Sequence, residues 1–443
     1  MLFSVFTPTN KADWIKDCYY SLLAQENQDW EWVVVANGPE EKKVFAEVYK
    51  TTLGDSRVKI FAYPSDRPQG IIGSLKKFAV SKCRGDILVE LDHDDQLTSD
   101  CLHEVEKALG REANAFVYSD CAFVNANGIN EAFGTYYGWK SPYVQDDKYI
   151  NQMFPVTPAS LAYIGYCPDH VRCWTRKAME LSGGYSDLAI CDDQDLMVRT
   201  YLAGSKMIKI PKSLYNHRVQ KSSASALLGN EIGEQSMKIR DNNFYALVEE
   251  WCRREDLLKI DLGGLHNCPK GWIPVDQDEC VCDIEDGVCA DVVDDNFPEY
   301  LYSVLRVLGH KNKVGCIRAH DFLEHIPSHL VPSVLRNLYE VLAPGGYLLT
   351  KTPAVCDDKG RCGRGAFQDP THKSFWSSNN WWYYTKKSFS KYVPEIDFSF
   401  VPVRLFNAYP SAWHEQHLIP YVYADMVKDY PEGHEVWVPG IRE

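Results

Sequence analysis

The sequence has no apolar run long enough to cross a bilayer, no internal repeat and no low-complexity segment. A membrane-spanning helix needs about 20 predominantly apolar residues, so we expect no transmembrane segment. Residues 1–6 are apolar, but they lack the basic start and the cleavage site of a secretory signal. We therefore interpret them as a buried first strand, and the chain as a globular protein of the cytoplasm.

Positive charge is also scarce. The 47 Lys and Arg residues face 61 Asp and Glu residues, which leaves a formal net charge of -14 and a pI of about 5.4. An acidic surface repels phosphate backbones, so nucleic acid is not expected as a partner. A nucleotide is not excluded, because it needs only a local site.

The cysteines lack a compact, repeating spacing. There are 15 of them in 443 residues, and in a chain of this size the pattern favours reduced thiols and a cytosolic setting. The length itself is sufficient for two hydrophobic cores. Nothing in the sequence indicates an oligomeric state.

Apolar runs alternate with amphipathic stretches in both halves, which predicts α/β folds with parallel sheets covered by helices. We expect two Rossmann-like three-layer domains, at 1–230 and 257–443, joined by a polar helical linker at 231–256. Expected strands lie at 4–7, 32–36, 58–63, 87–91, 258–262, 272–276, 314–318 and 347–350, and expected helices at 13–25, 73–83 and 332–342.

The most informative segment is Leu91-Asp92-His93-Asp94-Asp95, which ends an apolar strand. Open α/β sheets bind their ligands at the carboxyl ends of strands. Two side chains two positions apart on an extended backbone point the same way, so Asp92 and Asp94 can share one hard cation. Mg²⁺ and Mn²⁺ bind through one or two carboxylates together with substrate phosphates. A solvated acidic turn explains this motif equally well when it is taken alone.

Further motifs occur in a consistent order along the first half. They lie at residues 3–10, 21–25, 30–38, 76–79, 84–86, 92–95, 183–185 and 192–199. Together these motifs resemble family 2 glycosyltransferases. The resemblance implies a GT-A fold, a nucleotide-sugar donor, a glycan or glycoconjugate acceptor, and Mn²⁺ or Mg²⁺ as cofactor.

The resemblance also implies roles for residues on the donor side. Thr7, Thr9 and Asn37 would line the nucleotide base. Lys76 would lie near the nucleotide or its phosphates, and Asp92 would face the ribose. The family usually has Asp where this chain has Asn37, so the identity of the nucleotide stays open.

The resemblance also implies a metal ligand and a general base. Asp94 would bind the ion that neutralises the leaving diphosphate. Asp193 would be the general base that takes the proton of the acceptor hydroxyl, and one base without a nucleophile implies inversion. An acidic helix N-terminus explains Asp193 as well. The family often completes the metal site with a His where this chain has Gln220, so His217 is the substitute candidate.

The second half carries a weaker pattern, a glycine pair after one strand and an acid after the next. With the segments 318–327, 341–346 and 367–385 it resembles Rossmann-like S-adenosylmethionine-dependent methyltransferases, including those of phage-type bifunctional proteins. The resemblance implies that Gly263 and Gly264 approach the methionine end of the cofactor, Asp276 the ribose, and Asp283 the adenine side.

Methyl transfer to a hydroxyl needs positioning and a base, and the candidates for the base are His325 and His372. We expect a bifunctional enzyme that transfers a sugar and then O-methylates the glycan product. Two alternatives remain: a glycosyltransferase whose second domain is inactive, and a non-catalytic glycan- or nucleotide-binding protein.

Overall fold

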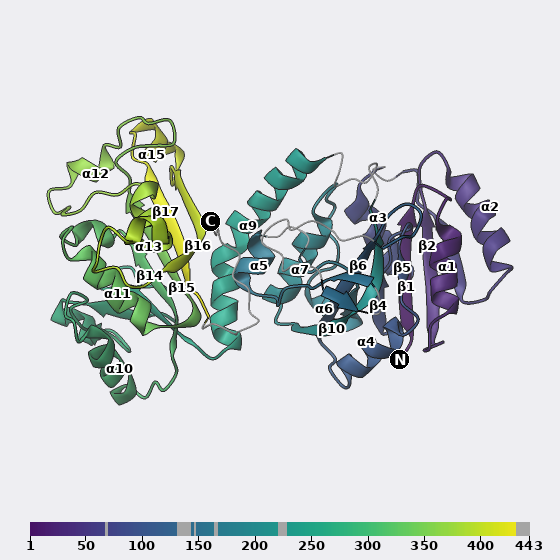
Figure 1. Ribbon diagram of the computed structural model, residues 1–443, viewed down its shortest axis with the longest axis horizontal. Coiled ribbons are helices and arrows are strands. Elements are labelled where there is room, and N and C mark those ends of the chain that lie inside the picture. The colour runs from purple at the N-terminus through teal and green to yellow at the C-terminus, as the bar shows by residue number, and fades with distance from the viewer. Residues whose placement is uncertain (67–69, 131–142, 146–147, 164–166, 220–227, 431–443) are drawn as a thin grey trace. The chain divides into compact units, whose positions relative to one another are not determined.

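The computed structural model describes residues 1–66, 70–130, 143–145, 148–163, 167–219 and 228–430. The chain divides into two compact units, Met1–Leu247 and Val248–Glu443. The division falls within α9 (Gly229–Arg254), a single helix where a helical linker was predicted (Figure 1). No helix of the described residues is long and apolar enough to cross a membrane.

The first unit is built on a mixed sheet with the strand order β3-β2-β1-β4-β9-β6-β10-β5, and β8 and β7 extend it beside β6. β3, β2, β1 and β4 are parallel neighbours, whereas β9 is antiparallel to both β4 and β6. The strands are β1 (Phe3–Thr9), β2 (Trp30–Ala36), β3 (Val58–Ala62), β4 (Ile87–Glu90), β5 (Gln96–Leu97), β6 (Ala115–Val124), β7 (Tyr143–Gln145), β8 (Lys148–Asn151), β9 (Arg172–Thr175) and β10 (Lys206–Arg218).

The parallel half of this sheet is covered by helices. Every residue of β1, β2 and β4 is buried, which explains why these strands are nearly continuous apolar runs. α3 packs on β1 and β2, and α2 packs on β2 and β3. The helices of this unit are α1 (Ile15–Leu23), α2 (Glu41–Thr52), α3 (Ile72–Lys82), α4 (Cys101–Leu109), α5 (Pro158–Tyr163), α6 (Arg176–Leu181) and α7 (Asp192–Leu202).

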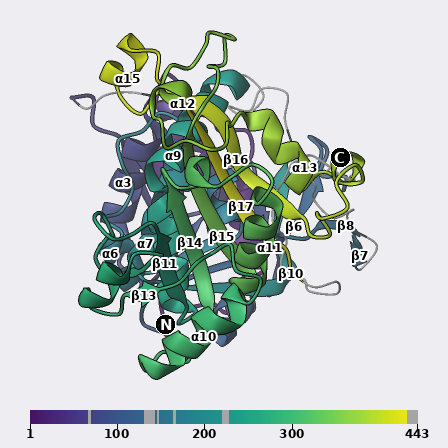
Figure 2. The same cartoon turned by 90° about the vertical axis from the view of Figure 1, so that its left-hand side faces the viewer.

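The second unit has a sheet with the order β13-β12-β11-β14-β15-β17-β16 (Figure 2). The strands from β13 to β15 are parallel, and β17 is antiparallel to its neighbours β15 and β16. The strands are β11 (Leu258–Leu262), β12 (Ile273–Asp276), β13 (Val288–Cys289), β14 (Val314–His320), β15 (Leu342–Pro353), β16 (Phe400–Ala408) and β17 (Tyr421–Lys428).

Helices again cover this sheet. They are α10 (Phe297–Val307), α11 (Val331–Val341), α12 (Gly365–Gln368), α13 (Trp382–Thr385), α14 (Lys387–Ser390) and α15 (Ala412–Gln416), with 3-10 turns η2 (Glu279–Asp283), η3 (Leu323–His325) and η4 (Ser378–Trp381). Trp376 and Trp381 are buried in the core of this unit. The segment 343–346, expected as a turn between helix and strand, belongs to β15, where it interrupts the pairing register with β14.

Candidate active site

The carboxyl ends of β2, β1 and β4 meet at one edge of the first sheet because the three strands are parallel neighbours. The backbone N–H of Asn37 donates to the carbonyl of Thr9 at 3.0 Å, so the segments after β1 and β2 leave the sheet together. The acidic run 92–95 follows β4. This edge is where an open α/β sheet binds its ligand.

The acidic run forms a turn whose backbone is held from two sides. The Cys18 thiol approaches the carbonyls of His93 at 3.2 Å and of Asp95 at 3.3 Å. Arg218 donates from its backbone N–H to Asp95 at 2.6 Å and from Nε to the carbonyl of Asp94 at 2.7 Å. Asp95 is buried, whereas Asp92 and Asp94 are partly exposed. These contacts fix the backbone of the turn and leave Asp92 and Asp94 partly exposed.

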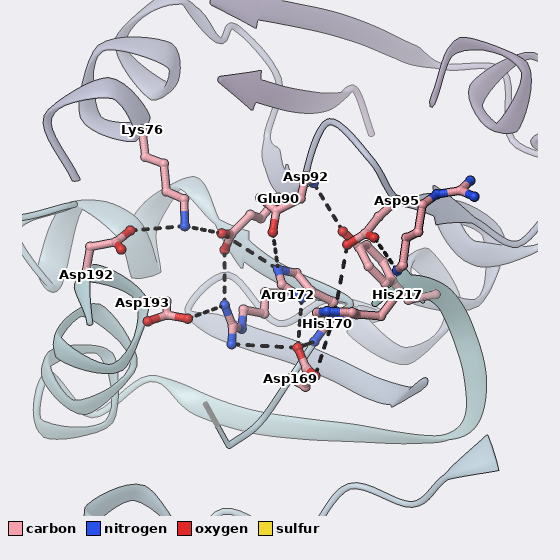
Figure 3. A network of polar contacts seen from close by, with 12 residues as sticks. Lys76, Glu90, Asp92, Asp95, Asp169, His170, Arg172, Asp192, Asp193 and His217 are labelled. Atoms are coloured by element: carbon pink, nitrogen blue, oxygen red, sulfur yellow. Dashed lines mark hydrogen bonds and ion pairs between the residues drawn. The ribbon is translucent and has the colours of Figure 1, made fainter. Parts of the chain in front are cut away.

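Beneath the turn, a buried network centres on Glu90 (Figure 3). Lys76 Nζ lies 2.5 Å from Glu90 and 3.0 Å from Asp192, and the hydroxyl of Tyr185 donates to Glu90 at 3.0 Å. Burial disfavours the charge of Asp192 and raises its pKa to about 6. Despite its own burial, Glu90 has a pKa well below its usual range because Lys76 and other cations surround it.

His170 and Arg172 add two cations to this network. His170 Nδ1 lies 2.8 Å from Asp169, and its Nε2 lies 3.6 Å from Asp92. Burial opposes the charge on this imidazole, but its acidic neighbours raise its pKa to about 10. His170 also belongs to both three-ligand groups that the described residues form here.

Asp193 lies in the first turn of α7, where the helix dipole favours an acid. Its Oδ2 accepts from Arg172 Nη1 at 2.7 Å, and its Oδ1 accepts from the Gln194 backbone. Its side chain is 22% exposed, whereas that of Asp192 is 6% exposed. Of these two neighbours, Asp193 is the one that a ligand can reach.

His217 lies on β10 beside the acidic turn. Its Nδ1 is 3.8 Å from Asp169 and 4.0 Å from Asp95, beyond hydrogen-bond distance. This buried atom has no hydrogen-bond partner among the described residues. Asp95 and His217 share a possible three-ligand group with His170, and Asp94 is a member of neither group found at this edge of the described structure.

The second unit places its predicted residues along the carboxyl edge of its own sheet. Gly263 follows β11 with a φ of +71°, and a Cβ there would lie 3.2 Å from the Phe322 ring. Its N–H donates to the carbonyl of Val275 at 2.9 Å. Asp276 ends β12 next to this turn, and Asp283 is exposed at the end of η2. Gly264 packs too closely on the backbone of Asp261 to carry a Cβ.

His325 and His372, far apart in the sequence, lie together just beyond β14. Their rings are 5.2 Å apart, edge to face. With Glu324 they form a group in which a ligand atom of each lies within 4.8 Å of the others. Glu324 is buried, which raises its pKa to about 8. The backbone N–H groups of Lys373 and Ser374 both donate to the Glu324 carbonyl, at 2.7 and 3.0 Å, and this joins the two segments.

Residues 4–162 match the family model described as "Glycosyl transferase family 2". The N-terminal unit carries a family 2 glycosyltransferase domain. Over 231 residues the chain is 25% identical to an O-antigen biosynthesis protein, RfbC, of Myxococcus xanthus, which covers 52% of this chain and 16% of that protein. Over 260 residues it is 26% identical to the hyaluronan synthase of Pasteurella multocida, which covers 58% of this chain and 24% of the synthase. The chain thus spans less than a quarter of the length of these relatives.

Solved structures were also compared. Residues 1–349 of S. aureus TarS, in complex with UDP-GlcNAc, match 58% of this chain and 73% of that chain with a TM-score of 0.40 and 17% identity. The mannosyltransferase PcManGT from Pyrobaculum calidifontis, in complex with GDP-Man and Mn²⁺, matches 57% and 63% with a TM-score of 0.38 and 17% identity.

Three residues expected on the donor side of the glycosyltransferase domain are buried. Thr7 is fully buried, and its hydroxyl accepts from Trp32 Nε1 at 2.9 Å. Lys76 is enclosed between Glu90 and Asp192, so its ammonium is neutralised inside the protein. In this structure neither side chain reaches the surface where a nucleotide would bind. Thr9 is buried too, with its hydroxyl on the carbonyl of Lys11.

Sequence reasoning missed four residues of the glycosyltransferase domain, namely Glu90, Asp169, His170 and Arg172. One of them left a signal. Glu90 is the only charged residue in an apolar run that forms a buried strand, and a buried charge requires a partner. The other three lie at or just before the start of β9, which reaches the site because it pairs antiparallel with β4. Local sequence patterns do not reveal this pairing.

Proposed function

We propose that the N-terminal unit is a metal-dependent, inverting glycosyltransferase that moves a sugar from a nucleotide-sugar to a glycan. The observation that carries this proposal is the continuity of the polar network. Glu90, which precedes the acidic turn, lies 3.9 Å from Arg172 Nη1, and the same nitrogen binds Asp193. Donor-side carboxylates and a candidate base are therefore held in one framework at the ligand-binding edge.

The chemistry of the donor set fits a divalent cation. Asp92 and Asp94 are partly exposed acids at the sheet edge, and the buried His217 Nδ1 has no hydrogen-bond partner among the described residues. Asp94 and His217 would hold Mn²⁺ or Mg²⁺, and Asp92 would face the ribose. The ion would supply positive charge where the diphosphate leaves. The rigid turn keeps Asp94 in place for this task.

Asp193 would accept the proton of the acceptor hydroxyl as the oxygen attacks the sugar carbon. Its bond to Arg172 leaves part of the carboxylate exposed and fixes the orientation of the rest. Asn37 follows β2, bonded to the backbone of Thr9, and would lie near the nucleotide base. Because Asn37 stands where the family usually has Asp, the nucleotide must be determined by experiment.

The direct test is a panel of nucleotide-sugars, with uridine, guanosine and other bases, incubated with the full chain and Mn²⁺. Release of a nucleoside diphosphate should require both the metal and Asp94. Excess chelator or Asp94→Ala should abolish it, because an uncompensated diphosphate is a poor leaving group. Full activity in excess chelator would refute the metal-dependent mechanism.

For the second unit we propose S-adenosylmethionine-dependent O-methylation of the glycan product. The strand order supports this, because β13-β12-β11-β14-β15 is a parallel, doubly wound sheet of the Rossmann-like kind that the resemblance implies. The Gly263 turn also follows β11 at the carboxyl edge of the sheet, where open α/β sheets bind their ligands.

S-adenosylmethionine would supply a methyl group activated by its sulfonium. Asp276 would bind the ribose hydroxyls, Gly263 and Gly264 would accommodate the methionine end, and Asp283 would lie on the adenine side. His325 and His372, which lie together just beyond β14, would be the candidate bases. The likeness to phage-type bifunctional proteins stays a prediction.

Calorimetric titration of the full chain with S-adenosylmethionine tests this second proposal. Ribose bonds to a carboxylate are charge-assisted, so Asp276→Ala should weaken binding by about tenfold or more. The affinity of Asp283→Ala for S-adenosylmethionine tests the adenine side of the site in the same way. A folded wild-type protein that shows no binding would make the second unit a scaffold or acceptor-binding module, and the glycosyltransferase proposal would stand.

A further inference from the structure

In the cluster of Glu324, His325 and His372, hydrogen bonds determine which ring nitrogen of each histidine carries the proton. Thr371 has one hydroxyl proton, and it donates this proton to Asp369 at 2.6 Å. The same oxygen lies 3.1 Å from His325 Nδ1. The hydroxyl can therefore only accept there, so Nδ1 of His325 carries the proton and Nε2 carries the lone pair in the neutral ring.

His372 is oriented in the same way by a different partner. Its Nδ1 lies 3.0 Å from the carbonyl oxygen of Ala366. A carbonyl only accepts, so Nδ1 is again the protonated nitrogen and Nε2 has the free lone pair. Imidazoles that bind metals characteristically donate their other N–H to a carbonyl or a similar acceptor. Both histidines thus have the outer hydrogen bonds of metal ligands before any metal is bound.

Glu324 supplies the third group. Its residue is 2% exposed, and Oε2 has no hydrogen-bond partner among the described residues. A buried carboxyl oxygen without a partner is costly, and a bound cation removes that cost. The segments that carry the three groups are joined by backbone hydrogen bonds from Lys373 and Ser374 to Glu324, so the cluster is held together by the fold.

We propose that Glu324, His325 and His372 form a binding site for a divalent transition-metal ion with open coordination positions. Two imidazoles and one carboxylate suit Fe²⁺, Zn²⁺, Co²⁺ or Mn²⁺, and leave room for a further oxygen ligand. Asp369, whose Oδ2 lies 3.9 Å from His372 Nε2, is close enough to act on a water in that position.

The role of this ion rests on the methyl transfer proposed above. A glycan hydroxyl bound at an open position would lose its proton to solvent more readily. Its oxygen would form a bond to the methyl carbon as the bond from that carbon to the sulfonium sulfur breaks, and S-adenosylhomocysteine would leave. His325 and His372 would then be metal ligands instead of general bases.

Titration of the full chain with Co²⁺, followed by its visible absorption, tests the site without any turnover. All variants are made in the double variant Asp94→Ala/His217→Ala, so that the candidate metal ligands of the first unit do not contribute to Co²⁺ binding. In this background one Co²⁺ should bind. Adding His372→Ala or Glu324→Gln should weaken binding by about a hundredfold or more, and Thr371→Val, which removes only the hydrogen bond to His325, by about tenfold.

His329→Ala is the matched control, because this exposed imidazole lies four positions after His325. It should leave the Co²⁺ affinity and the spectrum unchanged. Each variant is checked by its thermal unfolding curve, and the exposed Thr371 reports on the site even if Glu324→Gln fails to fold. Unchanged Co²⁺ binding in His372→Ala and Thr371→Val would overturn the proposal.

The same samples are titrated with S-adenosylmethionine. Metal binding without cofactor binding would refute the methyltransferase function and support the metal site. Cofactor binding without Co²⁺ binding at this cluster would support the methyltransferase function and refute the metal site. His325 and His372 would then again be the candidate general bases.

Discussion

At the scale of single residues, the glycosyltransferase domain separates acids that are buried from acids that remain partly exposed. Glu90, Asp169 and Asp192 are buried beside Lys76, His170 and Arg172, whereas Asp92, Asp94 and Asp193 remain partly exposed. Lys76 pairs with the buried acids Glu90 and Asp192, and Arg172 connects Glu90 to the outer Asp193.

Asp193→Asn tests the base directly. The amide oxygen can still accept from Arg172, so the framework should survive, but it cannot take a proton. We expect kcat to fall by roughly a hundredfold or more while KM for the donor changes little, measured by diphosphate release. Asp195→Asn, which alters a carboxylate bound to Arg199 at 2.6 Å, is the comparison. Near-normal turnover in Asp193→Asn would assign the base to Asp192 or Asp195.

His320 predicts an acid-sensitive contribution to the stability of the second unit. Burial, and then the cations Arg318, Lys351 and Arg404, lower its pKa to about 3 from 6.5. Between these values the unfolded chain binds a proton that the folded chain does not. Stability is therefore lost as pH falls below 6.5, by about 1.4 kcal/mol for each pH unit down to about 3.

Chemical denaturation at pH 7 and pH 5 measures this contribution. The wild-type chain should lose about 2 kcal/mol more of its unfolding free energy between these values than His320→Gln, which has no proton to bind. The comparison with the variant cancels the carboxylates that also titrate in acid. An identical loss in both proteins would show that His320 is not buried in its neutral form.

The sequence indicated the outer acids as candidates but not their surroundings. Asp94 and Asp193 stand in short motifs that are visible in the chain. By contrast, Lys76 pairs with Glu90 and Asp192, which lie 14 and 116 positions away in the sequence. Because of these pairs, the lysine neutralises acids inside the core. Spacing along the chain does not contain that information.

At the scale of elements, α3 is placed by a close approach that only glycine permits. A Cβ on Gly73 would lie 2.0 Å from the Ser186 carbonyl oxygen, and the Gly73 N–H donates to the Leu188 carbonyl at 2.9 Å. Because α3 carries Lys76, this contact also sets the depth of the buried lysine.

Gly73→Ala should therefore destabilise the first unit by about 1–3 kcal/mol, as overpacking does, and lower its melting temperature by several degrees. The control is Gly233→Ala in α9, where a Cβ meets nothing within 4 Å and alanine favours the helix. Differential scanning calorimetry of both variants makes the comparison. Equal melting temperatures would mean that α3 can move away from residues 186–188 at little cost.

Element positions were predictable where local patterns were strong. The apolar run 258–262 is β11, and the amphipathic stretch at 332–342 is α11 (Val331–Val341). Strands β16 and β17 were not predicted. In the sheet β17 lies between β15 and β16, so the spatial order of these strands differs from their order in the sequence. The long-range order of strands is set by tertiary packing, which periodicity along the chain does not encode.

At the scale of the whole molecule, the chain combines two sheets that each gather polar residues at their carboxyl edges. In the first, the edge collects Asp92, Asp94 and Asp193. In the second, it collects a glycine turn, Asp276 and the two histidines. If both proposals hold, the first unit makes the hydroxyl-bearing product that the second unit modifies, and a fused chain raises the effective concentration of one site for that product.

This order of reactions predicts an asymmetry between variants of the full chain. With a labelled methyl donor, a nucleotide-sugar and an unmodified glycan, the wild-type protein should incorporate methyl groups only when the sugar donor is present. Asp94→Ala should lose both sugar transfer and methyl incorporation, because without the ion the diphosphate does not leave and no new acceptor forms. Asp276→Ala should keep sugar transfer and lose methylation, because it weakens only the cofactor. Supplying the glycosylated product to Asp94→Ala should restore methyl incorporation. Methylation of the unmodified glycan by Asp94→Ala would instead show that the two units act on separate substrates.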